Sequence, residues 1–180
     1  MKPSLFPRAR RLLLALAAVF GVLLTAAPAQ ADGGHVSDFT YEIRPNHTSG
    51  MCLEVADWSL ANGAAVRQWP CTGGANQQWR RFYEPNSSTG PYWYVNVNSG
   101  MCLEIGGWAT YNGATANQWD CHWGANQTWY GNDGRIRTPV EYVQNKCLEI
   151  ADWRVDAGAP ARLWNCTGGA NQSYYFRRIY

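Results

Sequence analysis

Three kinds of side chain recur along this chain at a fixed spacing: a carboxylate, an indole and a pair of amides. In the first occurrence, Glu54 is followed by Trp69 and then by the adjacent Asn76 and Gln77. The apolar C–H face of a sugar ring packs against an aromatic side chain, and the sugar hydroxyls bind carboxylates and amides. Hydrogen bonds to an ionised carboxylate are also stronger than those between neutral groups. The combination therefore favours carbohydrate recognition.

The same set of residues is present three times, in the same order. Two cysteines 19 residues apart frame each copy, and the first cysteines of successive copies lie 50 and then 45 residues apart. Insertions thus fall between the copies and never inside them, which indicates that each copy folds as a unit within one larger structure. The two later sets are Glu104, Trp119, Asn126 and Gln127, and Glu149, Trp164, Asn171 and Gln172.

The repeated phrases resemble the ricin B-chain type of β-trefoil lectin, whose signature is a threefold Cys-x-Asp, Trp-x-Cys and Asn-Gln-x-Trp. The first copy reads Cys52-Leu53-Glu54, Trp69-Pro70-Cys71 and Asn76-Gln77-Gln78-Trp79, and the resemblance covers residues 37 to 180. It implies an all-β fold, the β-trefoil, in which a pseudo-threefold barrel carries hairpin caps. It also implies that the acid, the indole and the amide pair of each copy bind sugar, and that the protein is a lectin.

One departure from the family signature lies at the acid, which is Glu in every copy where the family usually has Asp. The longer side chain could line a pocket shaped for another sugar, or it could brace the barrel. Asp57 and Asp152, three residues after two of these glutamates, are candidate replacements for the missing Asp, whereas the second copy has Gly107 there. We therefore expect the second site to be the weakest.

The first 31 residues have the features of a secretory signal peptide. Basic residues precede an apolar run from Leu12 to Leu24, and small residues follow up to Ala29-Gln30-Ala31. The run is too short to favour an uncleaved membrane anchor, which is the alternative. We expect cleavage after Ala31, secretion to the extracellular space, and a single domain over residues 32–180. Its repeats would span approximately 37–82, 83–131 and 132–180.

The charge balance argues against one class of partner. The whole chain has 15 basic and 13 acidic residues, but four basic residues belong to the expected signal peptide, so the remaining 149 residues carry a net charge of −2. No basic cluster remains of the kind that nucleic-acid binding needs. We expect glycans or polysaccharide as partners, for example on a cell surface or cell wall. We expect no nucleic acid, no cofactor and no stable membrane insertion.

All six cysteines lie in the repeats, and the signal peptide directs them to an oxidising compartment. The repeat symmetry selects one pairing, a disulfide within each copy. Each bridge would close a loop of about 20 residues and stabilise the fold by roughly 3 kcal/mol in the chain-entropy model. A zinc site is the alternative, but it would need cysteines from different copies and has no repeated histidine beside them. The expected bridges are Cys52–Cys71, Cys102–Cys121 and Cys147–Cys166.

Short alternating segments predict strands, and no helical periodicity is present after the signal peptide. A glycine at the same place in each copy, as Gly63, Gly113 and Gly158, marks a turn. The tail from Tyr174 to Tyr180 could pair with the opening strand and so leave no exposed sheet edge. The alternating segments include Phe39–Ile43, Tyr92–Val97 and Gly134–Thr138.

Strand geometry places the acid and the indole of each copy side by side. Leu53 and Glu54 point to opposite faces, and we expect Leu53 to face the core. If the disulfide makes Cys52 and Cys71 direct partners, Glu54 lies opposite Trp69. A sugar-sized pocket would then open only where the two strands splay beyond the bridge.

The repeated aromatic residues fall into two groups. The aromatics of the Gln-x-Trp positions are expected in the core: Trp79, Trp129 and Tyr174. The other group could pack on a neighbouring hairpin or line the site: Trp58, Trp108 and Trp153.

Two other classes of function stay open. Trefoils also serve as protein-binding modules, such as protease inhibitors or cell-surface interaction modules, and the repeated tryptophans suit that use as well. Glu54 with Asp57 would be a carboxylate pair of the kind that glycosidases need, but three near-identical catalytic sites, one without its Asp, would be unusual. We therefore expect that the protein is not an enzyme.

Overall fold

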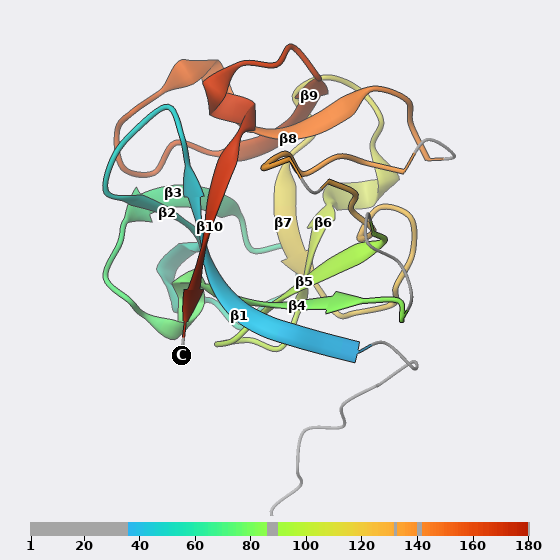
Figure 1. Cartoon of the computed structure of the whole chain (residues 1–180), viewed down its shortest axis with the longest axis horizontal. Coiled ribbons are helices and arrows are strands. Elements are labelled where there is room, and N and C mark those ends of the chain that lie inside the picture. Colours follow the sequence, from blue (N-terminus) through green and yellow to red (C-terminus); the bar gives the residue numbers. More distant parts are fainter. Residues whose placement is uncertain (1–35, 86–89, 132, 140–141, 180) are drawn as a thin grey trace, which may run out of the picture. The chain divides into compact units, whose positions relative to one another are not determined.

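Short β-strands dominate the part of the chain that the computed structural model describes, residues 36–85, 90–131, 133–139 and 142–179 (Figure 1). These residues belong to one compact unit. The strands are β1 Val36–Pro45, β2 Met51–Val55, β3 Val66–Pro70, β4 Gln78–Tyr83, β5 Tyr92–Asn96, β6 Cys102–Ile105, β7 Ala116–Trp119, β8 Lys146–Ile150, β9 Ala161–Asn165 and β10 Tyr174–Ile179. One-turn 3-10 helices follow several of them: η1 Ala56–Trp58, η2 Ala75–Gln77, η3 Gly106–Trp108, η4 Ala151–Trp153 and η5 Ala170–Gln172. The expected all-β class is confirmed.

The signal peptide expected over residues 1–31 lies outside the described residues. Within the described ranges, no helix has both the length and the apolar character that a membrane span requires.

Six strands form one antiparallel sheet in the order β10-β1-β4-β5-β6-β7, and the hairpins β2–β3 and β8–β9 are separate two-stranded sheets. The last strand closes on the first, with a register that runs from Thr40 opposite Ile179 to Pro45 opposite Tyr174. Figure 1 shows this contact, where the dark red β10 crosses the blue β1. The prediction that the tail pairs with the opening strand is therefore confirmed up to Ile179.

Large aromatic residues fill the interior at equivalent positions of the three copies. Trp79, Trp129 and Tyr174 are 0, 1 and 2% exposed, as expected for core residues. The indole N–H of Trp79 donates to the carbonyl oxygen of Leu53 at 3.0 Å, so the single polar atom of this ring is satisfied inside the core. Leu53 itself is fully buried, as its place in the alternation predicts.

The turn glycines join the three copies to one another in a ring. The backbone N–H of Gly63 donates to Gln118 in the second copy at 2.8 Å, and Gly113 donates to Leu163 in the third at 2.8 Å. Gly158 closes the ring by donating to Gln68 in the first copy at 2.9 Å. All three glycines have positive φ, at 81°, 93° and 86°, which glycine adopts without strain. Each copy is thus held by the turn of another.

A second set of contacts supports the loops that carry these turns. The amide of Gln118 donates to two carbonyls of the first loop, those of Ser59 and Ala61, at 2.9 and 3.0 Å. The third copy has Leu163 at the corresponding position and lacks an amide there. The hydroxyl of Tyr142 instead supports the second loop, donating to the carbonyl of Ala109 at 2.8 Å. Burial raises the pKa of Tyr142 to about 12, so this hydroxyl remains a donor.

The three expected disulfides are confirmed, and each has its two Cα atoms 5.1 Å apart. Because all six sulfurs are used in these bridges, none is left as a thiolate ligand for zinc.

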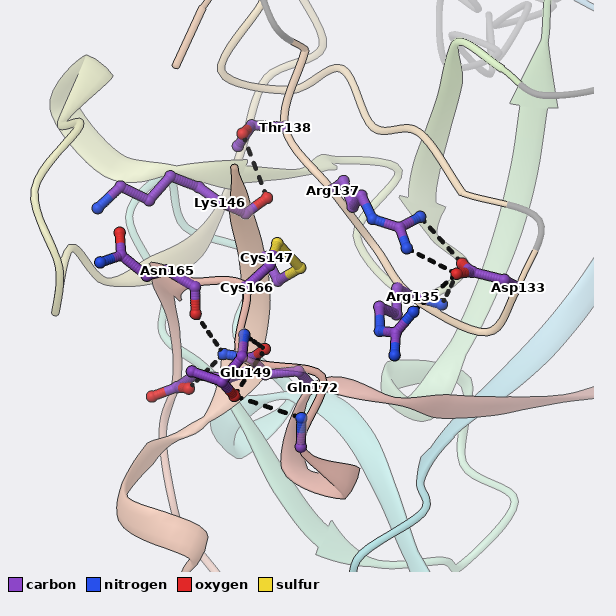
Figure 2. Close-up of a disulfide and its surroundings, with 12 residues drawn as sticks. Asp133, Arg135, Arg137, Thr138, Lys146, Cys147, Glu149, Asn165, Cys166 and Gln172 are labelled. Carbon is purple, nitrogen blue, oxygen red and sulfur yellow. Dashed lines mark hydrogen bonds and ion pairs between the residues drawn. A yellow bond between two sulfur atoms is a disulfide. The ribbon is translucent and has the colours of Figure 1, made fainter. Parts of the chain in front are cut away.

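The strand expected over Gly134–Thr138 is wrong. Arg137 forms isolated bridges to Tyr130 and Cys147, and no named strand of the described residues includes it. Its guanidinium binds the carboxylate of Asp133 through two hydrogen bonds of 2.9 and 2.6 Å (Figure 2). These contacts lower the pKa of Asp133 to about 2. Isolated backbone hydrogen bonds to Tyr130, Lys146 and Leu148, together with this ion pair, hold the segment.

Candidate functional site

The register of the first hairpin differs from the expected one by two residues. Cys52 pairs with Trp69, and Glu54 pairs with Arg67, so the prediction that Glu54 lies opposite Trp69 is wrong. Strand β3 ends before Cys71, which therefore reaches Cys52 diagonally across the end of the hairpin. Glu54 and Trp69 still share a face of the hairpin, but the direct neighbour of Glu54 is an arginine.

The acid and the amide pair form a buried layer in the first copy. Glu54 is 3% exposed, and its Oε1 accepts a hydrogen bond from Nε of Arg67 at 3.0 Å. Its Oε2 accepts from the side-chain amides of Asn76 and Gln77 at 3.3 and 3.1 Å. Both amides also donate to backbone carbonyls of the hairpin. This layer ties η2 to the hairpin β2–β3, which matches the alternative that the glutamate braces the barrel.

The same buried layer recurs in the third copy (Figure 2). Glu149 lies beside the Cys147–Cys166 disulfide and accepts from the amide of Gln172 at 2.9 Å. Asn171 donates to the same carboxylate oxygen at 3.3 Å. The second copy repeats this arrangement with Glu104, Asn126 and Gln127, at 3.2 and 3.1 Å.

A pocket that opens to solvent adjoins the buried layer of the first copy. The side chain of Asp57 is 82% exposed and accepts from Nη2 of Arg67 at 2.9 Å. Trp58 and Trp69 are 54 and 37% exposed. Arg67 therefore connects the buried glutamate to an exposed carboxylate. The pocket is lined by Glu54, Asp57, Trp58, Arg67, Trp69, Thr72 and Asn76.

Backbone strain accompanies the exposed acid and the indole that follows it. Asp57 and Trp58 both have left-handed φ values, 55° and 56°. For residues other than glycine such conformations cost about 1 to 3 kcal/mol each and cluster at ligand-binding sites. The third copy repeats the strain at Asp152 and Trp153, with the same two φ values. In the first and third copies the strained pair thus carries the exposed carboxylate and the exposed indole.

The indole of Trp58 packs directly against the backbone of Gly74, and the variant Gly74→Ala tests this contact. The backbone of Gly74 has φ −65° and ψ 152°, which alanine adopts freely, but a methyl group there would lie 2.7 Å from Cζ2 of Trp58 and 2.8 Å from Oδ1 of Asn76. The ring must move, so we expect the free energy of unfolding to fall by about 1 to 2 kcal/mol in denaturant titrations. In a Trp58→Ala background the same substitution should cost less, and the remaining cost comes from the contact with Oδ1 of Asn76; equal costs in the two backgrounds would contradict the contact with Trp58.

The third copy has the same arrangement of side chains as the first pocket. Arg162 donates from Nε to Glu149 at 2.9 Å and from Nη2 to Asp152 at 2.8 Å. The side chain of Asp152 is 69% exposed, Trp153 is 57% exposed and Trp164 is half-buried.

Three of the positions at which the second copy differs from the other two lie around its glutamate and its exposed loop. Asn117 pairs with Glu104 where the other copies have arginine, and Gly107 replaces the exposed acid. His122 approaches Glu104, with Nε2 3.6 Å from Oε2, and its ring stacks on Trp108 at a centroid distance of 5.7 Å. Burial raises the pKa of Glu104, although hydrogen bonds to the carboxylate partly offset this effect. That the second site is the weakest stays a prediction.

The residues predicted from the sequence thus separate into two groups. The glutamates and the Asn-Gln pairs are buried and bind one another, whereas the aspartates and the tryptophans before the second cysteines are exposed or half-buried. The sequence reasoning missed Arg67 and Arg162. The available signal was their position two residues before the indole, which places both side chains on one face of the strand.

Two family descriptions match consecutive parts of the chain. Residues 93–179 match the ricin-type beta-trefoil lectin domain, and residues 30–94 match the ricin-type beta-trefoil lectin domain-like family. Among curated proteins, none matches.

Several solved structures share the fold. ThreeFoil, a designed threefold symmetric protein, is 29% identical, with 79% of this chain and 100% of that chain covered and a TM-score of 0.69. An exo-β-1,3-galactanase from Clostridium thermocellum is 26% identical with a TM-score of 0.69; the match covers 78% of this chain but 30% of the galactanase. The C-half of an earthworm R-type lectin in complex with GalNAc is 15% identical, with 79% and 100% covered and a TM-score of 0.63. The expected β-trefoil is confirmed, and with both family matches covering residues 30 to 179 between them, the chain belongs to the ricin-type β-trefoil lectin domain family.

Proposed function

We propose that this chain is a secreted lectin that binds carbohydrate, without catalysing a reaction on it, through up to three shallow sites. The observation that carries the proposal is the first pocket. An exposed carboxylate, Asp57, is held in place by Arg67 and lines this pocket together with two partly exposed indoles, Trp58 and Trp69. Sugar recognition needs an apolar platform next to charged hydrogen-bonding groups, and this pocket has both. Secretion rests on the leader expected over residues 1–31.

Galactose-containing glycans are the ligand class that we propose. One similar structure is an exo-β-1,3-galactanase, and another was solved with GalNAc bound. Single open pockets of this size bind weakly. Three of them on one rigid body would raise the overall affinity only for a repeating or clustered glycan. A polysaccharide or a dense cell-surface or cell-wall glycan therefore fits better than a free monosaccharide.

A glycan array tests the proposal, with the double variant Asp57→Asn and Asp152→Asn beside the unaltered protein. Asparagine tolerates the left-handed backbone at both positions, so the fold should be kept. The substitution removes the charged acceptor, and we expect binding to galactose-containing glycans to weaken by at least about tenfold. The matched control is Glu84→Gln, an exposed acid away from the pockets, which should bind as the unaltered protein does.

Two results would contradict the proposal. If the unaltered protein bound no glycan on the array but captured a defined protein, such as a protease, the protein-binding alternative would hold. If the double variant bound glycans as strongly as the unaltered protein, the sugar sites would lie elsewhere.

A further inference from the structure

The three copies are not chemically equivalent at the position of the first pocket, and the corresponding positions are called the second and third pockets below. The residue that pairs with the buried glutamate is Arg67 in the first copy, Asn117 in the second and Arg162 in the third. The exposed acid follows the same pattern: Asp57, Gly107 and Asp152. Two copies therefore carry a guanidinium–carboxylate pair at the pocket, and one copy carries neither group.

In the first and third pockets the guanidinium also covers the indole. The central carbon of Arg67 lies 4.4 Å from the ring centroid of Trp69, and that of Arg162 lies 4.3 Å from the centroid of Trp164. At this distance the guanidinium occupies one face of the ring, where a sugar would otherwise stack. A sugar could use that face only by displacing the arginine.

Displacement of this arginine is costly because both ends of the guanidinium are fixed. Arg67 donates from Nε to the buried Glu54 and from Nη2 to Asp57, at 3.0 and 2.9 Å. Its side chain is only 20% exposed. Removal of the guanidinium would leave a buried carboxylate without its charged partner, which is strongly unfavourable.

A fixed guanidinium beside an exposed carboxylate suits two neighbouring hydroxyls. One hydroxyl can donate to the carboxylate of Asp57, while the other accepts from the guanidinium of Arg67. The pocket has two carboxylates for one guanidinium, so its net charge is negative. It therefore suits a neutral diol better than an acidic sugar.

The second pocket presents the opposite arrangement. Trp119 is 42% exposed, and no arginine or lysine lies over its ring among the described residues. Here a sugar can stack on the free indole face, and the charged pair that would select a diol is missing.

We propose, building on the lectin function above, that Arg67 and Arg162 determine specificity. They make the first and third pockets select the vicinal diol of a neutral, galactose-type sugar by hydrogen bonds. The second pocket accepts sugars by stacking on Trp119 and is tolerant of the hydroxyl pattern. The chain thus carries two classes of sugar site in one body.

Indole N–H signals in NMR spectra of the ¹⁵N-labelled chain report each pocket separately through Trp69, Trp119 and Trp164, once single Trp→Phe variants assign them. The probes are methyl β-galactoside and its 3-deoxy and 4-deoxy derivatives. At Trp69 and Trp164 we expect at least one deoxy derivative to bind about tenfold more weakly than the parent. At Trp119 both derivatives should bind within about threefold of the parent.

Variants that exchange the copies complete the test. Arg67→Asn with Arg162→Asn introduces the asparagine of the second copy and keeps Asp57 and Asp152. In the folded variant, the affinities for the deoxy derivatives and for the parent galactoside should differ by no more than about threefold at Trp69 and Trp164. Gly107→Asp with Asn117→Arg should create the tenfold discrimination at Trp119. If the two arginines only stabilise the fold, their replacement should lower the free energy of unfolding and leave the ratio of the affinities for the deoxy derivatives and the parent galactoside unaltered.

Three outcomes would overturn the inference. The ratio of the affinities for the parent galactoside and its deoxy derivatives could be the same at all three indoles, or the arginine variants could leave that ratio unchanged. The signals of Trp69 and Trp164 could also fail to respond to the galactoside. If the array experiment also finds no glycan bound, the lectin function fails as well. If the array finds binding while the ratios stay fixed, only the role of the arginines fails.

Discussion

Glu54→Gln is expected to lower the free energy of unfolding by about 2 to 3 kcal/mol. The glutamine can keep its oxygen where Oε2 now accepts from the amides of Asn76 and Gln77. Its NH₂ group must then take the place of Oε1 and face Nε of Arg67, which is itself a donor 3.0 Å away. Two donors face each other in a site that is 3% exposed, and the arginine loses its buried partner. Denaturant titration at pH 7 measures the change.

The second copy offers a matched control, because Glu104→Gln makes the same chemical change without that conflict. The Oε1 of Glu104 has no hydrogen-bond partner among the described residues, so an NH₂ group there meets no donor. Burial raises the pKa of Glu104, so the folded protein binds the proton more tightly than the unfolded chain does. The native glutamate therefore costs stability as the pH rises through its folded pKa, and glutamine avoids that cost.

We expect Glu104→Gln to change the free energy of unfolding by less than about 0.5 kcal/mol at pH 7, or to raise it slightly. The difference in the free energy of unfolding between the glutamine variant and the native protein should shrink at a pH below the pKa of this glutamate in the unfolded chain, where both side chains are neutral. Equal losses for Glu54→Gln and Glu104→Gln would contradict the importance of the arginine contact.

Most of the fold could be predicted because the sequence contains three copies of the same repeat. The cysteine pairs and the Gln-x-Trp aromatics hold the same spacing in every copy, so one interpretation had to suit all three. Trp79 could be placed in the core, and the tail could be paired with the opening strand, on alternation and closure alone. Local signals and the global fold agree at these positions, which is typical of a well-determined core.

The hairpin register could not be predicted, because cysteine spacing does not distinguish a direct partner from a diagonal one. Cys71 follows Pro70, the last residue of β3, and reaches back across the strand end. A shift of two residues keeps every side chain on its expected face, so alternation gives no warning. Only the pairing of the backbone reveals that Arg67, and not Trp69, lies opposite Glu54.

The role of the two arginines was not predicted, because the prediction relied on residues that occur in all three copies and these arginines occur in only two. Arg67 and Arg162 have Asn117 as their counterpart, so no threefold pattern marks them. The burial of the glutamates was also unpredictable. Carboxylates are mostly exposed unless they are paired, and the partners of Glu54 come from a different strand and from η2. In this molecule the repeated residues build the scaffold, and the differences among the copies shape the pockets.

Trp79→Ala and Trp69→Ala are expected to separate stability from binding. Trp79 is fully buried, and its indole N–H is bonded to Leu53, so its removal leaves a cavity and an unpaired carbonyl. We expect a loss of about 3 to 5 kcal/mol in the free energy of unfolding, measured by denaturant titration.

Trp69, only ten residues earlier, should behave in the opposite way. It is 37% exposed, and its main contact is the guanidinium of Arg67, a cation–π interaction worth about 0.5 to 1 kcal/mol at such a site. We therefore expect Trp69→Ala to cost no more than about 1 kcal/mol in stability. Because the guanidinium of Arg67 would lose the ring on which it rests, galactoside binding at the first pocket should weaken by at least about tenfold, as followed through the indole signal of Trp58, which lines the same pocket. Binding at the second pocket, followed through the Trp119 signal, serves as the internal control and should not change. A loss of several kcal/mol on removal of Trp69 would make it a core residue. Unaltered galactoside binding in a folded Trp69→Ala protein would contradict a role of Trp69 in holding the Arg67 guanidinium for binding, and would leave Trp58 as the indole that matters in this pocket.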